Sequence, residues 1–419
     1  MLDRTVAPPF TRSTHFELIH PDTISLSNGL KIFSINGGNQ RVIKIELLIK
    51  AGRWEETIWG AAYFSANLLS KGTSSKSSFE IARLFDHYGA HLEVSPGLDI
   101  VSISLYTLTK NLSPTLTLLH EILQEANFPE KELTQMKAIY LQNLKVNNEK
   151  TSFLASKLIR KNLFGERHPY GKELEESDVD LLTRNALVAH VDNLYHDLTI
   201  LVSGDVKQSS LNLIADIFSN FNYRPQPVRL HAFFEKKVSR QLQDKEGSLQ
   251  SSLRSAKTMI ERTHTDYPAV LFLNHILGGY FGSRLMKNIR EEKGLTYGIY
   301  SSFNTLQHHR YLVIGADVNK ENLSLTFDEI HKELRRLREE RVPAEEIETA
   351  RNHFIGSLQS EMTTPFAHAE KIKSSLLFNL PDDFYPQLIL RVDALTTEDL
   401  METAAKYFQE DSFLEVAVG

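Results

Sequence analysis

Two kinds of hydrophobic pattern alternate along the chain. Short stretches such as Lys44–Ile49 and Val101–Leu105 place apolar side chains at every second position, which predicts half-buried β-strands. Longer stretches, 112–123 and 323–337, repeat apolar residues every three to four positions, which predicts amphipathic helices. Strands and helices are mixed rather than strictly alternating. The pattern therefore favours an α+β fold over a doubly wound parallel sheet.

The same order of predicted elements occurs twice, which indicates an internal duplication. In each half a helix is followed by a proline that opens a second helix, at Pro129 and at Pro343. Each half then ends with a helix and an apolar strand, 198–204 in the first half and 413–419 in the second. Thr183 and Thr396 stand where a side-chain oxygen could cap these closing helices.

The boundary between the halves is expected in the polar, proline-containing stretch 222–227. We place it at residue 225. This gives two tandem homologous domains, 1–225 and 226–419, each predicted to pack a mixed, mainly antiparallel sheet against helices. A length of 419 residues suits two domains better than one core.

Composition excludes several functional classes. The net charge of −6 gives no general attraction for nucleic acid or anionic lipid. The chain has no cysteine, so disulfides and thiolate metal sites are excluded. No apolar run is long enough to span a membrane, and residues 1–10 lack the apolar core of a signal peptide. The expected location is cytoplasmic, or periplasmic if a signal peptide has been removed.

The segment 60–73 reads GAAYFSANLLSKGT and resembles the zinc-binding helix of the insulinase/pitrilysin peptidases. That family carries the framework G-x-A-H-F-x-E-H-x-x-x-K-G-T, which contains the zinc motif H-x-x-E-H. Six framework residues match: Gly60, Ala62, Phe64, Lys71, Gly72 and Thr73. The two metal-binding histidines, however, fall on Tyr63 and Asn67, and the catalytic glutamate falls on Ala66. Without its flanks, this segment would be read simply as an amphipathic helix.

The family's third zinc ligand is a glutamate on a later helix, and its position falls on Asn143. Amides and a phenol are poor zinc ligands beside imidazole, carboxylate and thiolate. The resemblance therefore implies that this chain binds no metal or other cofactor.

The second half resembles the family's C-terminal signature, S-R-L-x-x-x-x-R-x-x-x-G-L-x-Y, at residues 283–297. The arginine and tyrosine that work as a pair in this signature are Arg290 and Tyr297. We expect Arg290 to end a helix, Gly294 to turn the chain and Tyr297 to lie on the following strand. The alternative is a surface ion pair between Arg290 and a neighbouring glutamate, with Tyr297 packed on the sheet.

Just before this signature, the glycine-rich stretch 278–282 is similar to the substrate-binding glycine loop of the mitochondrial processing peptidase, although much shorter. Gly278, Gly279 and Gly282 are therefore candidate substrate-binding residues. The alternative is a helix C-cap followed by a turn. Two histidine-containing segments, 168–171 and 308–309, are read as a turn and a hairpin loop without chemistry of their own.

The resemblance implies the fold of the mitochondrial processing peptidase and a division of labour between two homologous subunits. In such pairs one subunit carries H-x-x-E-H with its zinc, and the other supplies the arginine and tyrosine. The implied function is that of the non-catalytic subunit, inactive alone, which acts on peptide substrates together with an H-x-x-E-H partner. The alternative is a structural or peptide-binding protein of the same fold with no role in proteolysis.

Overall fold

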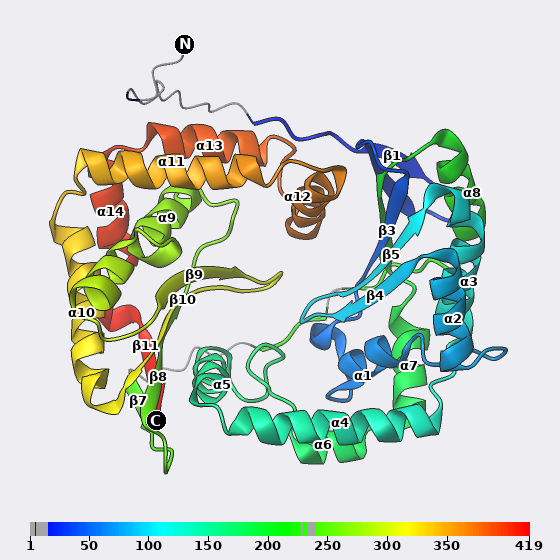
Figure 1. The fold of residues 1–419 in the computed structure, drawn as a ribbon, viewed down its shortest axis with the longest axis horizontal. Coiled ribbons are helices and arrows are strands. Elements are labelled where there is room, and N and C mark those ends of the chain that lie inside the picture. Colours follow the sequence, from blue (N-terminus) through cyan, green and yellow to red (C-terminus); the bar gives the residue numbers. More distant parts are fainter. Residues whose placement is uncertain (1–4, 6–15, 228, 233–239) are drawn as a thin grey trace.

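The computed structural model describes residues 5, 16–227, 229–232 and 240–419, and places two β-sheets on opposite sides of a two-part molecule (Figure 1). The expectation that residues 1–10 lack the apolar core of a signal peptide concerns a segment that, except for Thr5, lies outside the described residues. In the described part of the chain, no helix is long and apolar enough to cross a membrane.

The first sheet has six strands in the order β1-β2-β6-β3-β5-β4. Only β2 and β6 pair in parallel, so the sheet is mixed and mainly antiparallel. Its strands are β1 (Asp22–Ser25), β2 (Lys31–Asn36), β3 (Val42–Ile49), β4 (His91–Pro96), β5 (Val101–Leu108) and β6 (Leu198–Gly204).

The second sheet repeats this plan with five strands in the order β7-β11-β8-β10-β9. Again one pair, β7 with β11, is parallel and the others are antiparallel. Its strands are β7 (Arg240–Gln243), β8 (Gln250–Thr258), β9 (Ile299–Thr305), β10 (Arg310–Asn319) and β11 (Leu414–Val418). The predicted α+β fold and the internal duplication are therefore confirmed.

The helices follow the same duplication. The first half contains α1 (Ala61–Leu68), α2 (Ser78–Tyr88), α3 (Leu112–Glu125), α4 (Glu130–Asn148), α5 (Thr151–Phe164), α6 (Glu176–Leu181), α7 (Arg184–Leu194) and α8 (Gln208–Ser219). The second half contains α9 (Tyr267–Asn274), α10 (Leu323–Glu339), α11 (Ala344–Ser360), α12 (Pro365–Phe378), α13 (Phe384–Ala394) and α14 (Thr397–Tyr407). The caps of α7 and α14 are as predicted, because Thr183 and Thr396 accept hydrogen bonds from backbone N–H groups of the first turn.

Two helices connect the halves by exchange. Helix α5 of the first half packs on strands β8 and β11 of the second sheet, and α12 of the second half packs on β6 and β2 of the first (Figure 1). Each half has its own apolar core, and two further apolar clusters combine residues of both halves. Along the chain, the predicted domain boundary at residue 225 falls after the last strand of the first sheet and before the first strand of the second, outside every helix and strand. The boundary itself stays a prediction.

A partly buried ion network holds α12 on the first sheet. Lys44 Nζ on β3 lies 2.8 Å from Glu46 and 3.0 Å from Glu370 of α12, and Lys373 of α12 lies 3.0 Å from Glu46. Burial alone would lower the pKa of Lys44, but its bonds to the two carboxylates outweigh burial and raise it. The network therefore keeps its charges inside the junction, where an unpaired charge would be costly.

Candidate functional site

Helix α1 carries the degenerate zinc motif, and its start is held by a buried carboxylate. Gly60 precedes the helix with φ +93°, a left-handed conformation that favours glycine, and a Cβ there would lie 2.9 Å from Leu182. Glu56 accepts hydrogen bonds from the N–H groups of Gly60, at 3.1 Å, and of Ala62, at 2.8 Å. Burial raises the pKa of Glu56 to about 7. The Glu56 carboxylate is thus engaged by N–H groups at the start of α1.

The motif positions on α1 make contacts that suit packing rather than metal binding. The ring of Tyr63 meets Tyr140 of α4 with ring centroids 5.3 Å apart. Asn67 donates its side-chain amide to the carbonyl oxygen of Tyr63, one turn back, at 2.8 Å. Ala66 is buried in the core of the first half. The phenol and the amide therefore occupy the space where the family framework places imidazoles.

The third ligand position, Asn143, lies on α4 as predicted and is exposed. Helix α4 does lie against α1, so the structure brings together the two helices that the family needs for a metal site. The residue of α4 that contacts Tyr63 is Tyr140, which lies one turn before Asn143.

These residues do not fit a zinc ion. A catalytic zinc site uses three imidazole, carboxylate or thiolate ligands and keeps a position open for water. Tyr63, Asn67 and Asn143 offer a phenol and two amides, and Ala66 offers no base. Across the described parts of the chain, no three histidine, aspartate or glutamate side chains gather in a way that could hold a metal ion.

Arg290 lies in the last turn of a helical segment, η4 (Met286–Glu292), as predicted. The turns here are wider than in an α-helix, since the N–H of Lys293 bonds to the carbonyl of Asn288, five residues back. The Arg290 guanidinium lies over the ring of Phe281, with its central carbon 4.9 Å from the ring centroid. An aromatic face attracts a cation in this geometry. Arg290 is thus held against Phe281 at the surface.

Gly294 turns the chain with φ +61°, as predicted. The prediction that Tyr297 lies on a strand is wrong, because strand β9 begins only at Ile299. The side chain of Thr296 accounts for this later start. Its hydroxyl lies within hydrogen-bond distance of two carbonyl oxygens, those of Asp317 at 2.7 Å and Gly298 at 3.0 Å, and accepts a hydrogen bond from the N–H of Gly298. This local turn leaves Tyr297 in a loop, where it is 92% exposed.

At each of the three glycines of the short glycine-rich stretch, a side chain would come too close to a neighbouring residue. A Cβ on Gly278 would lie 2.6 Å from the backbone nitrogen of Ser301 on β9. A Cβ on Gly282 would lie 2.8 Å from the ring of Tyr280, and one on Gly279 would lie 3.0 Å from His275. The stretch therefore allows the end of the helix after α9 to approach the sheet closely. Its predicted role in substrate binding stays a prediction.

A group of histidine and aromatic rings at the junction of the halves was missed by the sequence analysis. Trp54 of the first half stacks on His308 of the β9–β10 hairpin, with ring centroids 3.8 Å apart at 18°. His168 stacks on Phe164 at 5.5 Å and meets the edge of Trp54, also at 5.5 Å. Burial, reinforced by three neighbouring histidines, lowers the pKa of His168 to about 4. We call Trp54, Phe164, His168, Tyr170, His231, His308 and His309 the ring cluster.

Models of one peptidase family match both halves of the chain. The model described as insulinase (peptidase family M16) matches residues 31–176, and the model described as peptidase M16 inactive domain matches residues 182–354. An uncharacterised zinc protease, YmxG of Bacillus subtilis, is 23% identical over 392 residues, which cover 92% of this chain and 95% of that protein. A protein of Helicobacter pylori named non-peptidase homolog YmxG is 22% identical over 350 residues, which cover 81% of this chain and 80% of the relative.

Solved structures agree with these matches. The crystal structure of a peptidase M16 inactive domain from Pseudomonas fluorescens has a TM-score of 0.87 and 25% identity, and the match covers 95% of this chain and 98% of that one. A protease from Helicobacter pylori has a TM-score of 0.86 and 20% identity, with 96% of this chain and 100% of that chain covered. The chain therefore belongs to the insulinase family of M16 peptidases, as a member in which the zinc-binding motif is degenerate.

Proposed function

We propose that this chain is the non-catalytic subunit of a heterodimeric zinc peptidase. In this proposal an H-x-x-E-H-containing homologous subunit holds the zinc, and this chain contributes Arg290 and Tyr297. The observation that carries the proposal is the contrast between the two halves: the ligand positions are filled by residues that do not suit zinc, while Arg290 and Tyr297 are present in a solvent-accessible segment.

The chemistry of the pair suits the binding of a peptide backbone. A guanidinium and a phenolic O–H donate hydrogen bonds, and the carbonyl oxygen of a peptide gains negative charge as hydrolysis begins. Arg290 is held over Phe281, which limits the conformational freedom that it would lose on binding. Tyr297 is almost fully exposed and can reach a peptide or a partner surface.

The candidate glycines belong to the same region. Gly278 brings the segment before Phe281 against β9, so it fixes the platform on which Arg290 rests. In the proposal, Gly278, Gly279 and Gly282 shape the backbone beside the bound peptide.

The second candidate function is that of a structural or peptide-binding protein with no role in proteolysis. The relative named non-peptidase homolog favours this alternative. The two functions differ in what Arg290 does, because a structural protein does not need an exposed donor pair.

Co-expression with the H-x-x-E-H homologue of the same organism tests the proposal. We expect a heterodimer with zinc-dependent peptidase activity, and neither chain should be active alone. Arg290→Ala and Tyr297→Phe should each lower kcat about a hundred- to a thousandfold, the usual effect of losing one donor to a developing oxyanion.

Arg341→Ala is the matched control, because Arg341 is an exposed arginine of the same half that pairs with Glu398. This variant should keep full activity. If the pair mainly holds the substrate backbone, KM rises instead of kcat falling. Unchanged kcat/KM in both site variants, or the failure of any heterodimer to form, would favour the structural alternative.

A further inference from the structure

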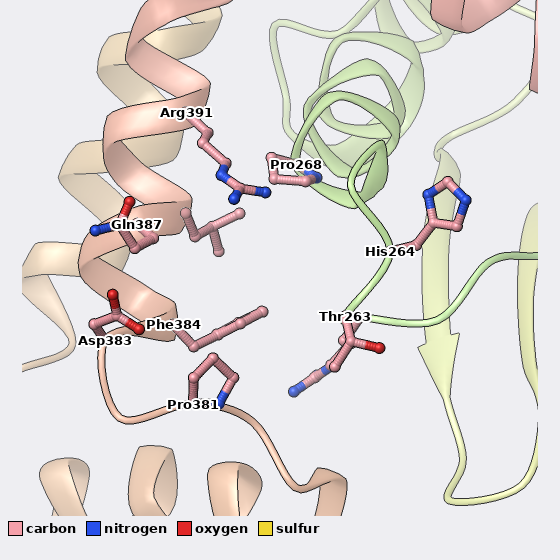
Figure 2. A pocket seen from close by; sticks show the side chains of 10 residues that line it. Thr263, His264, Pro268, Pro381, Asp383, Phe384, Gln387 and Arg391 are labelled. Atoms are coloured by element: carbon pink, nitrogen blue, oxygen red, sulfur yellow. The ribbon is translucent and has the colours of Figure 1, made fainter.

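A cavity of about 390 Å³ opens in the second half (Figure 2). None of the residues that line it belongs to the degenerate zinc motif or to the C-terminal signature. The cavity lies between the loop 262–264 that leads into α9 and the beginning of α13. Its size falls within the range of pockets that bind small molecules. Nothing in the family assignment or in the proposed function accounts for it.

One wall of the cavity is apolar. Pro268 lies in the first turn of α9, Pro381 precedes α13, and Phe384 and Leu388 come from successive turns of α13. Figure 2 shows the ring of Phe384 reaching from α13 toward Thr263 on the opposite side. This wall can cover one apolar side chain of a ligand.

The other functional groups of the cavity are mainly cationic. The guanidinium of Arg391 extends from α13 toward Pro268 (Figure 2), and among the described residues it makes no ion pair. Arg262 is held in place, because its Nη1 donates to Ser374 Oγ at 2.6 Å and its guanidinium lies 4.6 Å from the ring centroid of Phe378. The Nε of Arg262 is buried and has no hydrogen-bond acceptor among the residues that the structure describes.

The single carboxylate of the lining does not neutralise Arg391. Figure 2 shows Asp383 and Gln387 on the side of α13 away from the ring of Phe384, while Arg391 and Phe384 reach across the cavity. A second carboxylate nearby, Asp266, is engaged by Lys406 at 2.6 Å and by the hydroxyl of Tyr407 at 2.7 Å. The cavity therefore combines an apolar wall with cations whose charge is not balanced within it.

We propose that this cavity binds an organic carboxylate that carries an apolar group, the chemistry of the C-terminal residue of a peptide. The guanidinium of Arg391 would pair with the carboxylate, and the wall around Phe384 would cover the apolar group. The same chemistry occurs in a small free acid and at the end of a peptide chain. The site does not depend on the zinc chemistry of a partner subunit.

Binding of two matched probe pairs to the full chain tests the site, with affinity measured by calorimetry or ligand-observed NMR. The first pair is N-acetyl-phenylalanine and its neutral amide, and the second is an N-acetylated tripeptide ending in phenylalanine and its amide. Each acid should bind at least tenfold more tightly than its amide, because a charge-assisted hydrogen bond is lost in the amide. Tighter binding of the tripeptide acid would identify a peptide end, and tighter binding of the single residue would identify a small acid.

Arg391→Gln should weaken binding of the acids at least tenfold and leave binding of the amides unchanged. Arg391 is exposed on α13, and glutamine is a good helix former, so the fold should be preserved. Arg341→Gln is the control and should bind like the unmodified protein. Equal binding of acid and amide, unchanged binding by Arg391→Gln, or no saturable binding at millimolar concentration would each overturn the proposal. The comparison of acid and amide is decisive even without the variants.

Discussion

Replacing His168 with asparagine is expected to make the stability of the protein less sensitive to acid. The side chain is 4% exposed and lies in the ring cluster between Phe164 and Trp54. Its Nδ1 accepts a hydrogen bond from the N–H of Tyr170 at 3.1 Å. The side-chain oxygen of asparagine can take over this acceptor role, because it stands at a similar distance from the backbone. The variant therefore removes the titrating group and keeps its hydrogen bond.

The magnitude follows from the pKa. Burial and the neighbouring His309, His231 and His308 lower the pKa of His168 from 6.5 to about 4. The unfolded chain thus binds a proton more readily than the folded protein, so stability is full well above pH 6.5 and is lost as the pH falls toward 4. For these two pKa values the linkage relation gives a loss of about 2 kcal/mol between pH 8 and pH 5.

Urea unfolding at pH 8 and at pH 5 measures this loss, with fluorescence of Trp54 and Trp59 as the signal, since these are the two tryptophans of the chain. The asparagine variant should be less stable at pH 8, because it loses the ring contacts. Its further loss on going to pH 5 should, however, be about 2 kcal/mol smaller than that of the unmodified protein. His87→Asn, on the exposed face of α2, should keep the full pH dependence. Equal pH dependence in the His168 variant and the unmodified protein would refute the assignment.

Two further predictions concern the zinc motif and the junction. The zinc motif is restored by four changes, Tyr63→His, Ala66→Glu, Asn67→His and Asn143→Glu. The resulting variant should bind zinc in a metal titration. A variant that folds but takes up no zinc would show that the alignment with the family motif is out of register. A variant that keeps Asn143 and carries the other three changes should bind zinc more weakly. Lys44→Met leaves Glu46 in the junction with Lys373 as its remaining ion-pair partner, so the charge stays paired. The variant should lower the free energy of unfolding by about 1.5–3 kcal/mol in chemical denaturation, the usual contribution of a hydrogen bond to a charged group. A loss below 1 kcal/mol would mean that Lys373 compensates fully.

Much of the architecture could be predicted because it depends on local patterns. The period-two stretches became β3 and β5, and the longer periodic stretches became α3 and α10. The duplication was visible in the sequence because both halves use the same helix starts and caps. The matching strand orders of the two sheets confirm it. Signals of this kind can be read from the sequence alone, because they depend on residues that are close together along the chain.

Contacts between distant segments could not be predicted in this way. The ring cluster joins four segments far apart in sequence, and two of them, 168–171 and 308–309, carry only turn signals when read alone. The packing of α5 and α12 on the sheet of the other half could not be predicted either. The amphipathic pattern of a helix shows that one face is buried, but not which sheet that face packs on. Tyr297 was expected on the strand that follows the turn at Gly294, whereas the hydroxyl of Thr296 stabilises a further turn before that strand begins.

The candidate site shows the same division. The framework of the zinc motif and the third ligand position fall on α1 and α4, and these two helices lie against each other in the structure. The contact of Tyr63 with Tyr140 was not predicted, because it depends on how each helix is oriented about its own axis, which the sequence does not give. Phe281 was noted only as part of a glycine-rich stretch, although its ring supports Arg290.

Metal analysis of the purified chain tests most directly whether this chain holds catalytic zinc. The chain should be purified without chelator, dialysed against zinc and then freed of loosely bound metal by gel filtration. Elemental analysis should then find far less than one zinc per chain, and peptide cleavage by the chain alone should be undetectable. About one zinc per chain, together with cleavage that EDTA abolishes, would contradict the account.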